Sequence, residues 1–201
     1  RYKNIVEGVN TYWLSQPVKN AFSHAHSLFV EGGADNVRYG IDASYNQNKG
    51  VMKESGRDRF GLGFSLIYRI KDKITIKNYI SYAHTHAYNS PYGSFSHAKL
   101  NPYERIYNDN GELIPKLSDG DTNPLYDALL PNRNFTKDQE FREQLSVDWF
   151  ICDGLRLKGQ MAIVKGETSG EIYKSPFSAE FLKTTYNSES RVQEYLPIAE
   201  R

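Results

Sequence analysis

The stretch that decides the fold runs from Asp58 to Tyr82 and reads DRFGLGFSLIYRIKDKITIKNYISY. From Phe60 to Ile70 every second residue is apolar, and the residues between them are mostly small or polar. The same alternation resumes at Ile74, after a short polar turn. Because successive side chains of a strand point to opposite faces, this pattern predicts two antiparallel strands, each with one apolar and one polar face.

The same alternation recurs along the rest of the chain. It predicts six strands, at residues 20–32, 36–47, 58–71, 73–86, 138–151 and 155–167. Each is longer than the roughly 9–11 residues with which a tilted strand crosses a bilayer. We therefore expect an all-β fold of up-and-down antiparallel neighbours, with no helix inside these spans.

The connections between these strands alternate between short and long. Short turns are expected at residues 32–35, 71–73 and 152–154, whereas a medium connection falls at 48–57 and a very long one at 87–137. Short turns at one end and long loops at the other are typical of outer-membrane barrels. Another long segment begins near residue 168.

The expected fold is a segment of a larger transmembrane β-barrel. Six strands are too few to enclose a wide lumen, and an open apolar edge would aggregate. We expect residues 1–201 to form part of one barrel domain, as a piece of a longer protein that has an extracellular loop at 87–137. No plug domain is recognised in this chain.

The composition agrees with a barrel and disfavours two other classes. A formal net charge of +1 gives no indication of a nucleic-acid partner. The absence of a run of about 18 apolar residues argues against a bundle of membrane helices. The 15 tyrosines and 10 phenylalanines suit the aromatic girdles of a barrel, although aromatic residues are also good strand formers.

Several short motifs are more specific than the strand pattern. They are Asn10–Leu14, Val37–Gly40, Asn48–Met52, Asn89–Ser96 and Asn101–Tyr103. In this order, and over roughly residues 8–180, they resemble the SusC/RagA family of TonB-dependent outer-membrane transporters of the Bacteroidota. The words Ser-Pro-Tyr-Gly-Ser-Phe and Asn-Pro-Tyr carry most of this resemblance.

The resemblance implies a function in import. Members of that family are barrels of 22 strands with an N-terminal plug, and they pair with a SusD-like surface lipoprotein that acts as a lid. TonB drives uptake of oligosaccharides or peptides. For this chain the resemblance implies a multi-pass location in the outer membrane, contact with its lipid, and coupling to TonB through parts outside residues 1–201.

The long loop holds the candidate contacts for a substrate or for the lipoprotein. They are Ser90, Pro91, Tyr92, Gly93, Ser94, Phe95, Asn101 and Tyr103. Aromatic rings suit the apolar faces of sugars, so Tyr92, Phe95 and Tyr103 are candidates for stacking on a glycan. Packing of the loop on itself explains them equally well.

Five charged residues fall on the polar phase of the predicted strands and are expected to face the lumen. They are Arg38, Asp42, Arg69, Arg142 and Asp148. Two interpretations stay open for them. They line a path for the solute, or they pair with one another in a solvated wall.

No catalytic, cofactor or metal site is expected. The pairs His24/His26 and His84/His86 have the spacing of two ligands on one strand face, but they fall on the apolar phase and lack a third ligand. The Asp119-x-Asp121-x-Asn123 motif begins like a calcium loop but has Pro124 where that loop needs glycine. The rival to the transporter is a soluble or surface glycan-binding β-sandwich, whose apolar face would pack against a second sheet.

Overall fold

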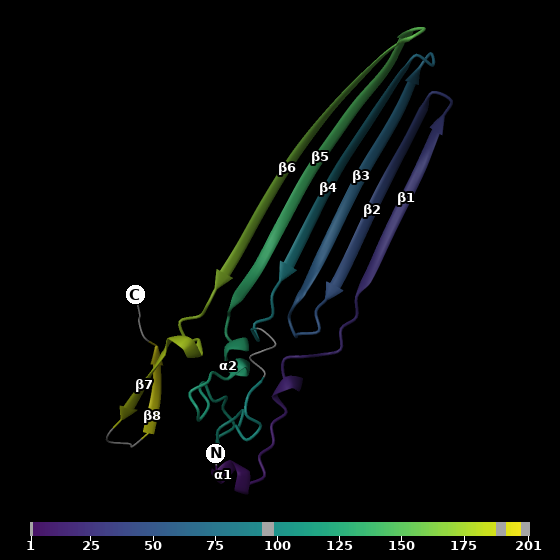
Figure 1. The fold of residues 1–201 in the computed structure, drawn as a ribbon. Helices are drawn as coiled ribbons and strands as arrows, with labels where there is room; N and C mark the ends of the chain where they lie inside the picture. The colour runs from purple at the N-terminus through teal and green to yellow at the C-terminus, as the bar shows by residue number, and fades with distance from the viewer. Residues whose placement is uncertain (1, 94–98, 188–191, 198–201) are drawn as a thin grey trace.

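The computed structural model describes residues 2–93, 99–187 and 192–197. Six strands form one sheet, and each pairs in antiparallel fashion with its neighbour in the chain (Figure 1). They are β1 (His24–Ala34), β2 (Val37–Lys49), β3 (Gly56–Ile70), β4 (Ile74–Tyr88), β5 (Arg133–Cys152) and β6 (Leu155–Tyr173). The predicted all-β, up-and-down fold is confirmed, and no helix interrupts the six spans. Within the described residues the sheet is open, with β1 and β6 at its edges, as a fragment of a barrel would be.

The remaining elements are short. They are α1 (Tyr2–Val6), η1 (Trp13–Ser15), α2 (Pro124–Ala128), η3 (Ala179–Phe181), β7 (Leu182–Asn187) and β8 (Val192–Pro197). The pair β7–β8 forms a separate two-stranded sheet, which the sequence pattern did not predict. No helix among the described residues is long and apolar enough to cross a membrane.

Several predicted boundaries were wrong by a few residues. The first strand begins at His24 rather than near residue 20. The fifth begins at Arg133 instead of 138, and the sixth continues to Tyr173 instead of 167. The ladder between β5 and β6 runs on past the last clear alternation, pairing Arg133 with Tyr173. The long loop is therefore shorter than predicted and spans 89–132.

All three predicted hairpins form, and they lie together at one end of the sheet (Figure 1). The turn after β3 has positive φ at Lys71 (47°) and Asp72 (54°), and the amide of Lys73 donates to the carbonyl of Ile70 at 3.0 Å. This is the type I′ geometry, whose twist matches that of the flanking strands. The first hairpin turns at residues 35–36, so Gly32 and Gly33 belong to β1 and not to the turn.

The strand register separates the side chains of the sheet into two faces. The row Ala43, Leu62, Tyr82 and Phe141 runs across β2–β5 on the face that we call the apolar face. The neighbouring row Asp42, Gly63, Ser81 and Arg142 lies on the opposite one, the polar face.

No second layer covers the apolar face in the described part of the chain. Phe64 is 39% exposed and Leu157 55% exposed, and the hairpin β7–β8 lies beyond the end of the sheet (Figure 1). A sandwich would bury these side chains against another sheet. The apolar face of β1–β6 is instead open to its surroundings.

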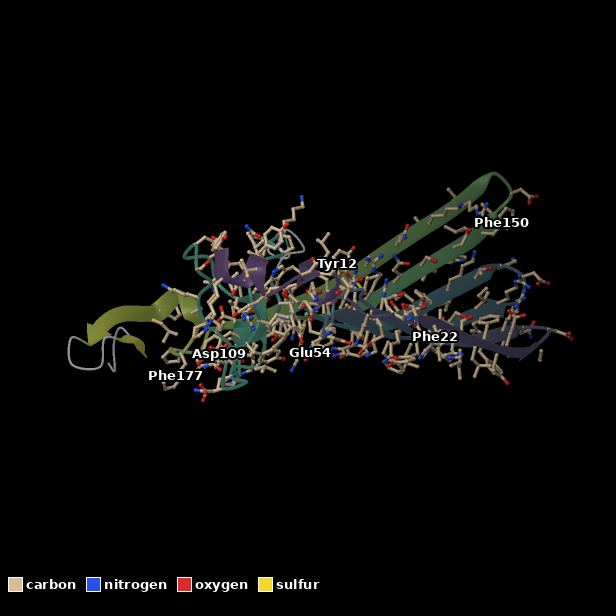
Figure 2. All side chains as sticks on the ribbon, turned by 90° about the horizontal axis from the view of Figure 1, so that it is seen from below. Tyr12, Phe22, Glu54, Asp109, Phe150 and Phe177 are labelled. Atoms are coloured by element: carbon tan, nitrogen blue, oxygen red, sulfur yellow. The ribbon has the colours of Figure 1, made fainter. Side chains whose placement is uncertain are left out.

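The buried apolar side chains lie outside the six-stranded sheet. Among the described residues they are Trp13, Leu117, Ala128, Ala179 and Leu182. These belong to segments at the end of the sheet opposite the hairpins, which we call the loop end. In Figure 2, Tyr12, Glu54, Asp109 and Phe177 lie at the loop end, and Phe150 marks the hairpin end.

Candidate functional site

The loop end is built around contacts between the N-terminal segment and the long loop. The amide of Thr11 donates to the carbonyl of Pro102 at 2.7 Å, and the indole of Trp13 donates to the carbonyl of Asn101 at 3.0 Å. Trp13 is 2% exposed. Two motifs that are far apart in the sequence, Asn10–Leu14 and Asn101–Tyr103, therefore form one packed unit.

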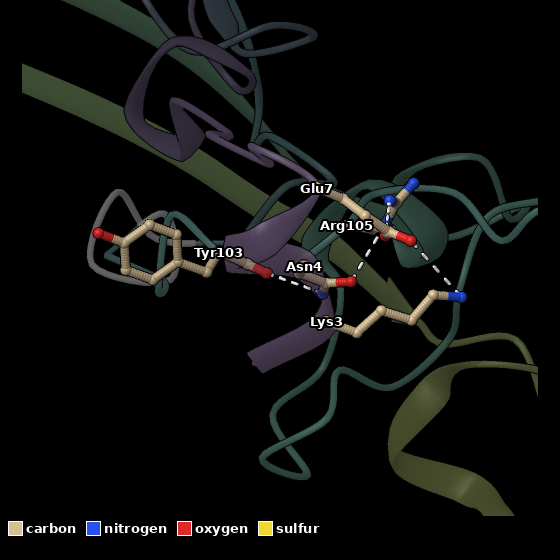
Figure 3. A network of polar contacts seen from close by, with 5 residues as sticks. All are labelled: Lys3, Asn4, Glu7, Tyr103 and Arg105. Carbon is tan, nitrogen blue, oxygen red and sulfur yellow. Dashed lines mark hydrogen bonds and ion pairs between the residues drawn. The ribbon is translucent and has the colours of Figure 1, made fainter.

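A polar network extends this unit to α1 (Figure 3). The guanidinium of Arg105 lies 2.6 Å from the carboxylate of Glu7 and 3.2 Å from the side-chain oxygen of Asn4. Asn4 also donates to the carbonyl of Tyr103 at 2.8 Å. Because these polar groups bond to one another, α1 has a defined position on the long loop, although it buries little apolar surface.

Asn123 organises the second half of the long loop. It is fully buried, and its side-chain oxygen accepts from the amide of Leu125, which caps the N-terminus of α2. Its side-chain nitrogen donates to the carbonyl of Ile106 at 3.1 Å. Both the oxygen and the nitrogen of this amide therefore hold the loop. Asn123 is the third residue of the Asp119-x-Asp121-x-Asn123 motif, whose spacing begins like a calcium loop. No group of three or more His, Cys, Asp or Glu residues in the described ranges could hold a metal ion.

The main cavity of the loop end has a volume of about 670 Å³. It lies where β4 ends and β5 begins, and segments 89–93 and 172–174 form parts of its wall. Its wall combines aromatic rings, side-chain amides and charged groups. The rings and amides belong to Tyr88, Tyr92, Phe135, Tyr173, Asn89, Asn132 and Asn134, and the charged groups to Glu54, Asp127, Arg133 and Lys174. We call this cavity the loop-end pocket.

Hydrogen bonds hold one wall of the loop-end pocket in place. The hydroxyl of Ser90 donates to the carbonyl of Lys53 at 2.7 Å, and the side chain of Asn89 donates to that of Asn134 at 2.9 Å. The ammonium of Lys53 lies 5.7 Å from the centre of the Tyr92 ring. Burial raises the pKa of the Tyr92 phenol above its ordinary value, and the carboxylate of Glu54 raises it further. The phenol is therefore a neutral hydrogen-bond donor at physiological pH.

Ser178 supplies an unsatisfied polar group to the same cavity. The residue lines the loop-end pocket and is 2% exposed. Its hydroxyl has no hydrogen-bond partner among the described residues. A buried hydroxyl without a partner costs about 1–3 kcal/mol.

The predicted loop residues divide into three groups. Ser90, Pro91, Tyr92 and Gly93 line the loop-end pocket. Asn101 and Tyr103 do not line it, since their backbone carbonyls hold the N-terminal segment. Ser94 and Phe95 lie outside the described residues.

Sequence reasoning missed the part of the wall that comes from β5, β6 and the segment after β6. Phe135 and Tyr173 were placed in loops because the predicted strands stopped short of them. Phe135 is an apolar residue on the same phase of the strand as Phe141, and this signal could have placed it in β5. Nothing in the sequence around Ser178 indicated that this residue would line the pocket.

The five predicted lumen-facing charges all lie on the polar face, as their rows require. Three of them are paired: Arg38 with Glu31, Arg142 with Glu140, and Asp148 with Arg156. The carboxylate of Asp42 lies over Gly63, and a Cβ atom added to Gly63 would be 2.2 Å from it. The partners of these three residues lie outside the predicted five, so both the solute path and the mutually paired wall stay predictions.

The four histidines singled out by their spacing lie on the apolar face, close to the loop end. His24 and His26 are on β1, with ring centres 5.0 Å apart, and His84 and His86 are three strands away on β4. His86 packs against the ring of Phe135 at 5.7 Å. The two pairs are separate.

No protein-family model matches the chain, and no curated protein is significantly similar to it. A function must therefore be proposed from the geometry and from the motifs.

Proposed function

We propose that this chain is part of the wall of a SusC/RagA-type transporter, which imports oligosaccharides or peptides across the outer membrane. The observation that carries the proposal is the exposed apolar face of the sheet, bordered at both ends by aromatic rows. A water-soluble protein rarely exposes so large a contiguous apolar surface. A membrane barrel requires one, since lipid surrounds it.

The composition of the apolar face changes along the strands. Towards the loop end, aromatic residues lie in two adjacent rows: Tyr45, Phe60, Tyr82 and Phe141. Towards the hairpins, a second set occupies neighbouring rows: Tyr39, Tyr68 and Trp149. One row lies between the two sets, and apart from Glu143 it is apolar: Ile41, Phe64 and Ile80. Girdles of this kind mark the two interfaces of a barrel with the bilayer.

The height of this band agrees with a bilayer. Ten residues separate Phe60 from Ile70, which is about 34 Å along the strand at a rise of roughly 3.4 Å per residue. A tilt of about 40° reduces this to a height of about 26 Å, close to the apolar band of roughly 25 Å on known barrels.

One polar pair interrupts the band. Asn78 lies on the apolar face of β4, and its side chain donates to the carboxylate of Glu143 on β5 at 3.3 Å. Both side chains are half-buried. The pairing lowers the cost of placing a carboxyl group in an apolar environment.

The loop-end pocket supports a glycan as the solute. The rings of Tyr88, Tyr92, Phe135 and Tyr173 and three side-chain amides line one cavity, and sugars present apolar ring faces together with hydroxyl groups. In this proposal the loop end faces the cell exterior, where a SusD-like lipoprotein covers it. TonB acts through parts outside this chain.

Uptake of labelled oligosaccharides tests the proposal. We expect cells that carry the Tyr92→Ala variant to import about tenfold less than wild type, because stacking on one ring contributes roughly 1–1.5 kcal/mol. Tyr107→Ala is the matched control, since Tyr107 is a loop tyrosine, 52% exposed, that does not line the loop-end pocket. Unchanged glycan uptake in a strain lacking the protein would refute the proposal.

A further inference from the structure

The polar face carries an uneven distribution of charge. Near the hairpins it holds five cations that belong to β2, β3, β4 and β6. They are Arg38, Arg69, Lys77, Arg156 and Lys158, which we call the basic collar. The acids on this part of the polar face are Glu31 and Asp148. The formal charge here is therefore positive by three, whereas the whole chain carries +1.

The other half of the same face is balanced. Towards the loop end its cations are Arg57, Arg59 and Arg142, and its acids are Asp42, Asp138 and Glu140. The surplus of positive charge is thus confined to the hairpin end. A solute that moves along this face from the loop end would meet a neutral surface first and a positive one last.

The five cations of the basic collar differ in their partners. Glu31 pairs with Arg38, while Asp148 pairs with Arg156 and lies 3.9 Å from Lys158. Within the described part of the chain the side chains of Arg69 and Lys77 form no hydrogen bond or ion pair, although the charge of Lys77 also acts on the carboxylate of Asp148. Both are exposed, so they are available to an external anion.

A cavity accompanies these charges. It has a volume of about 400 Å³ and is lined by the first hairpin together with Arg38, Ile67 and Arg69. The charged groups that line it are the guanidiniums of Arg38 and Arg69 and the carboxylates of Glu31 and Asp35. The cavity itself therefore has no net formal charge, and the positive surplus lies on the face around it. Guanidinium binds carboxylate and sulfate groups through paired N–H donors.

We propose that the imported solute is an acidic oligosaccharide, whose carboxylate or sulfate groups are attracted by the basic collar. This inference rests on the proposed import function and adds the charge of the substrate. Rings of Arg and Lys select anions in membrane pores. Clefts of one sign raise the local concentration of the opposite charge and increase rates by about 10–10³-fold.

The test compares uptake of two sugars that differ only in charge. An oligogalacturonate and its fully methyl-esterified form have the same backbone, but the ester masks every carboxylate. We expect wild-type cells to import the acid about tenfold faster than the ester, and we expect this preference to shrink at high salt. A sulfated neutral oligosaccharide, compared with its desulfated form, distinguishes sulfate from carboxylate as the recognised group.

The variants assign the preference to the basic collar. Removing both unpaired cations, as Arg69→Gln with Lys77→Gln, should reduce the preference for the acid at least threefold and leave ester uptake unchanged. Arg57→Gln with Arg59→Gln removes the same charge from the same face at the loop end, and should keep the preference.

The other outcomes overturn the inference. Equal uptake of acid and ester by wild type would show that the solute is not selected by charge. Equal loss of both sugars in the Arg69/Lys77 variant, with the protein present in the membrane at the wild-type level, would show that these cations support uptake without selecting charge. Import of peptides but of neither sugar would end the glycan proposal itself. The test of the basic collar would then compare uptake of an acidic peptide with uptake of its amidated form. Equal uptake of the two peptides would refute selection by charge.

Discussion

The sheet and the loop end of this molecule are stabilised in opposite ways. In β1–β6 the large apolar side chains are exposed, and the continuous antiparallel ladders satisfy the backbone. At the loop end a few apolar side chains are buried, and much of the irregular backbone is satisfied by side chains such as Asn123. Under the proposed function the two regions meet different solvents: lipid surrounds the sheet, and water surrounds the loop end.

The largest expected effect separates the two regions. Trp13→Ala should destabilise the loop end by about 3–5 kcal/mol, because it removes a buried side chain and its hydrogen bond to the long loop. The sheet should be unaffected, since Trp13 makes no part of its ladders. Hydrogen exchange should show faster exchange in residues 99–132 and unchanged protection in β3 and β4. Simultaneous loss of protection in both regions would mean that they fold as one unit.

The second prediction tests the lipid-facing assignment. Leu145→Arg places a charge in the middle of the apolar band, and should cost roughly 2–4 kcal/mol in a bilayer. Gln144→Arg is the matched control, because it introduces the same residue one position away on the polar face. Urea unfolding in lipid vesicles measures both. Equal costs for the two variants would contradict the assignment of the faces.

The third prediction concerns polar groups in the loop end. Asn123→Ala removes the N-cap of α2 and leaves the carbonyl of Ile106 with only the amide of Ile114 as donor, so the loop end should lose about 1–3 kcal/mol. Limited proteolysis within 99–132 should become several-fold faster. Asn110→Ala is the control, since this asparagine is exposed and lies in a turn of the same loop. If the two variants are cleaved equally fast, the buried amide does not hold the loop.

The smallest effect is expected at the hairpin end of the sheet. Arg156→Gln breaks the ion pair with Asp148, in which Arg156 is 57% exposed. Exposed pairs contribute about 0–1 kcal/mol, so we expect only a slight shift in the urea midpoint. A loss above 2 kcal/mol would show that polar contacts matter in the sheet as they do at the loop end.

The sequence predicted the sheet better than the loop end. Each strand repeats every two residues, so Phe64 and Leu66 reveal their common face without any knowledge of their partners. Arg38, Asp42, Arg69, Arg142 and Asp148 were assigned to one face for the same reason. The start of β5 was less certain because Lys137 and Gln139 are polar although they share the phase of Phe135 and Phe141.

The loop end could not be predicted because its contacts are not periodic. Nothing local in Asn10–Leu14 indicates that Trp13 lies against Asn101. The loop-end pocket likewise needs Ser90, Phe135 and Ser178 to meet, and their proximity depends on where β4, β5 and β6 end. The residues Ser90–Gly93 were candidates because their sequence resembles a family motif, and they do line the loop-end pocket. Asn101 and Tyr103 instead accept hydrogen bonds that hold the N-terminal segment.

The hydrogen bond from Trp13 to Asn101 also has a consequence for the order of folding. It joins residues that are 88 positions apart, and β1–β4 lie between them in the chain. Closing so long a segment is entropically unfavourable until the intervening hairpins have shortened it. We therefore expect the two N-terminal hairpins to form first and the N-terminal segment to dock last, so that Trp13 becomes buried in a late, slow kinetic phase.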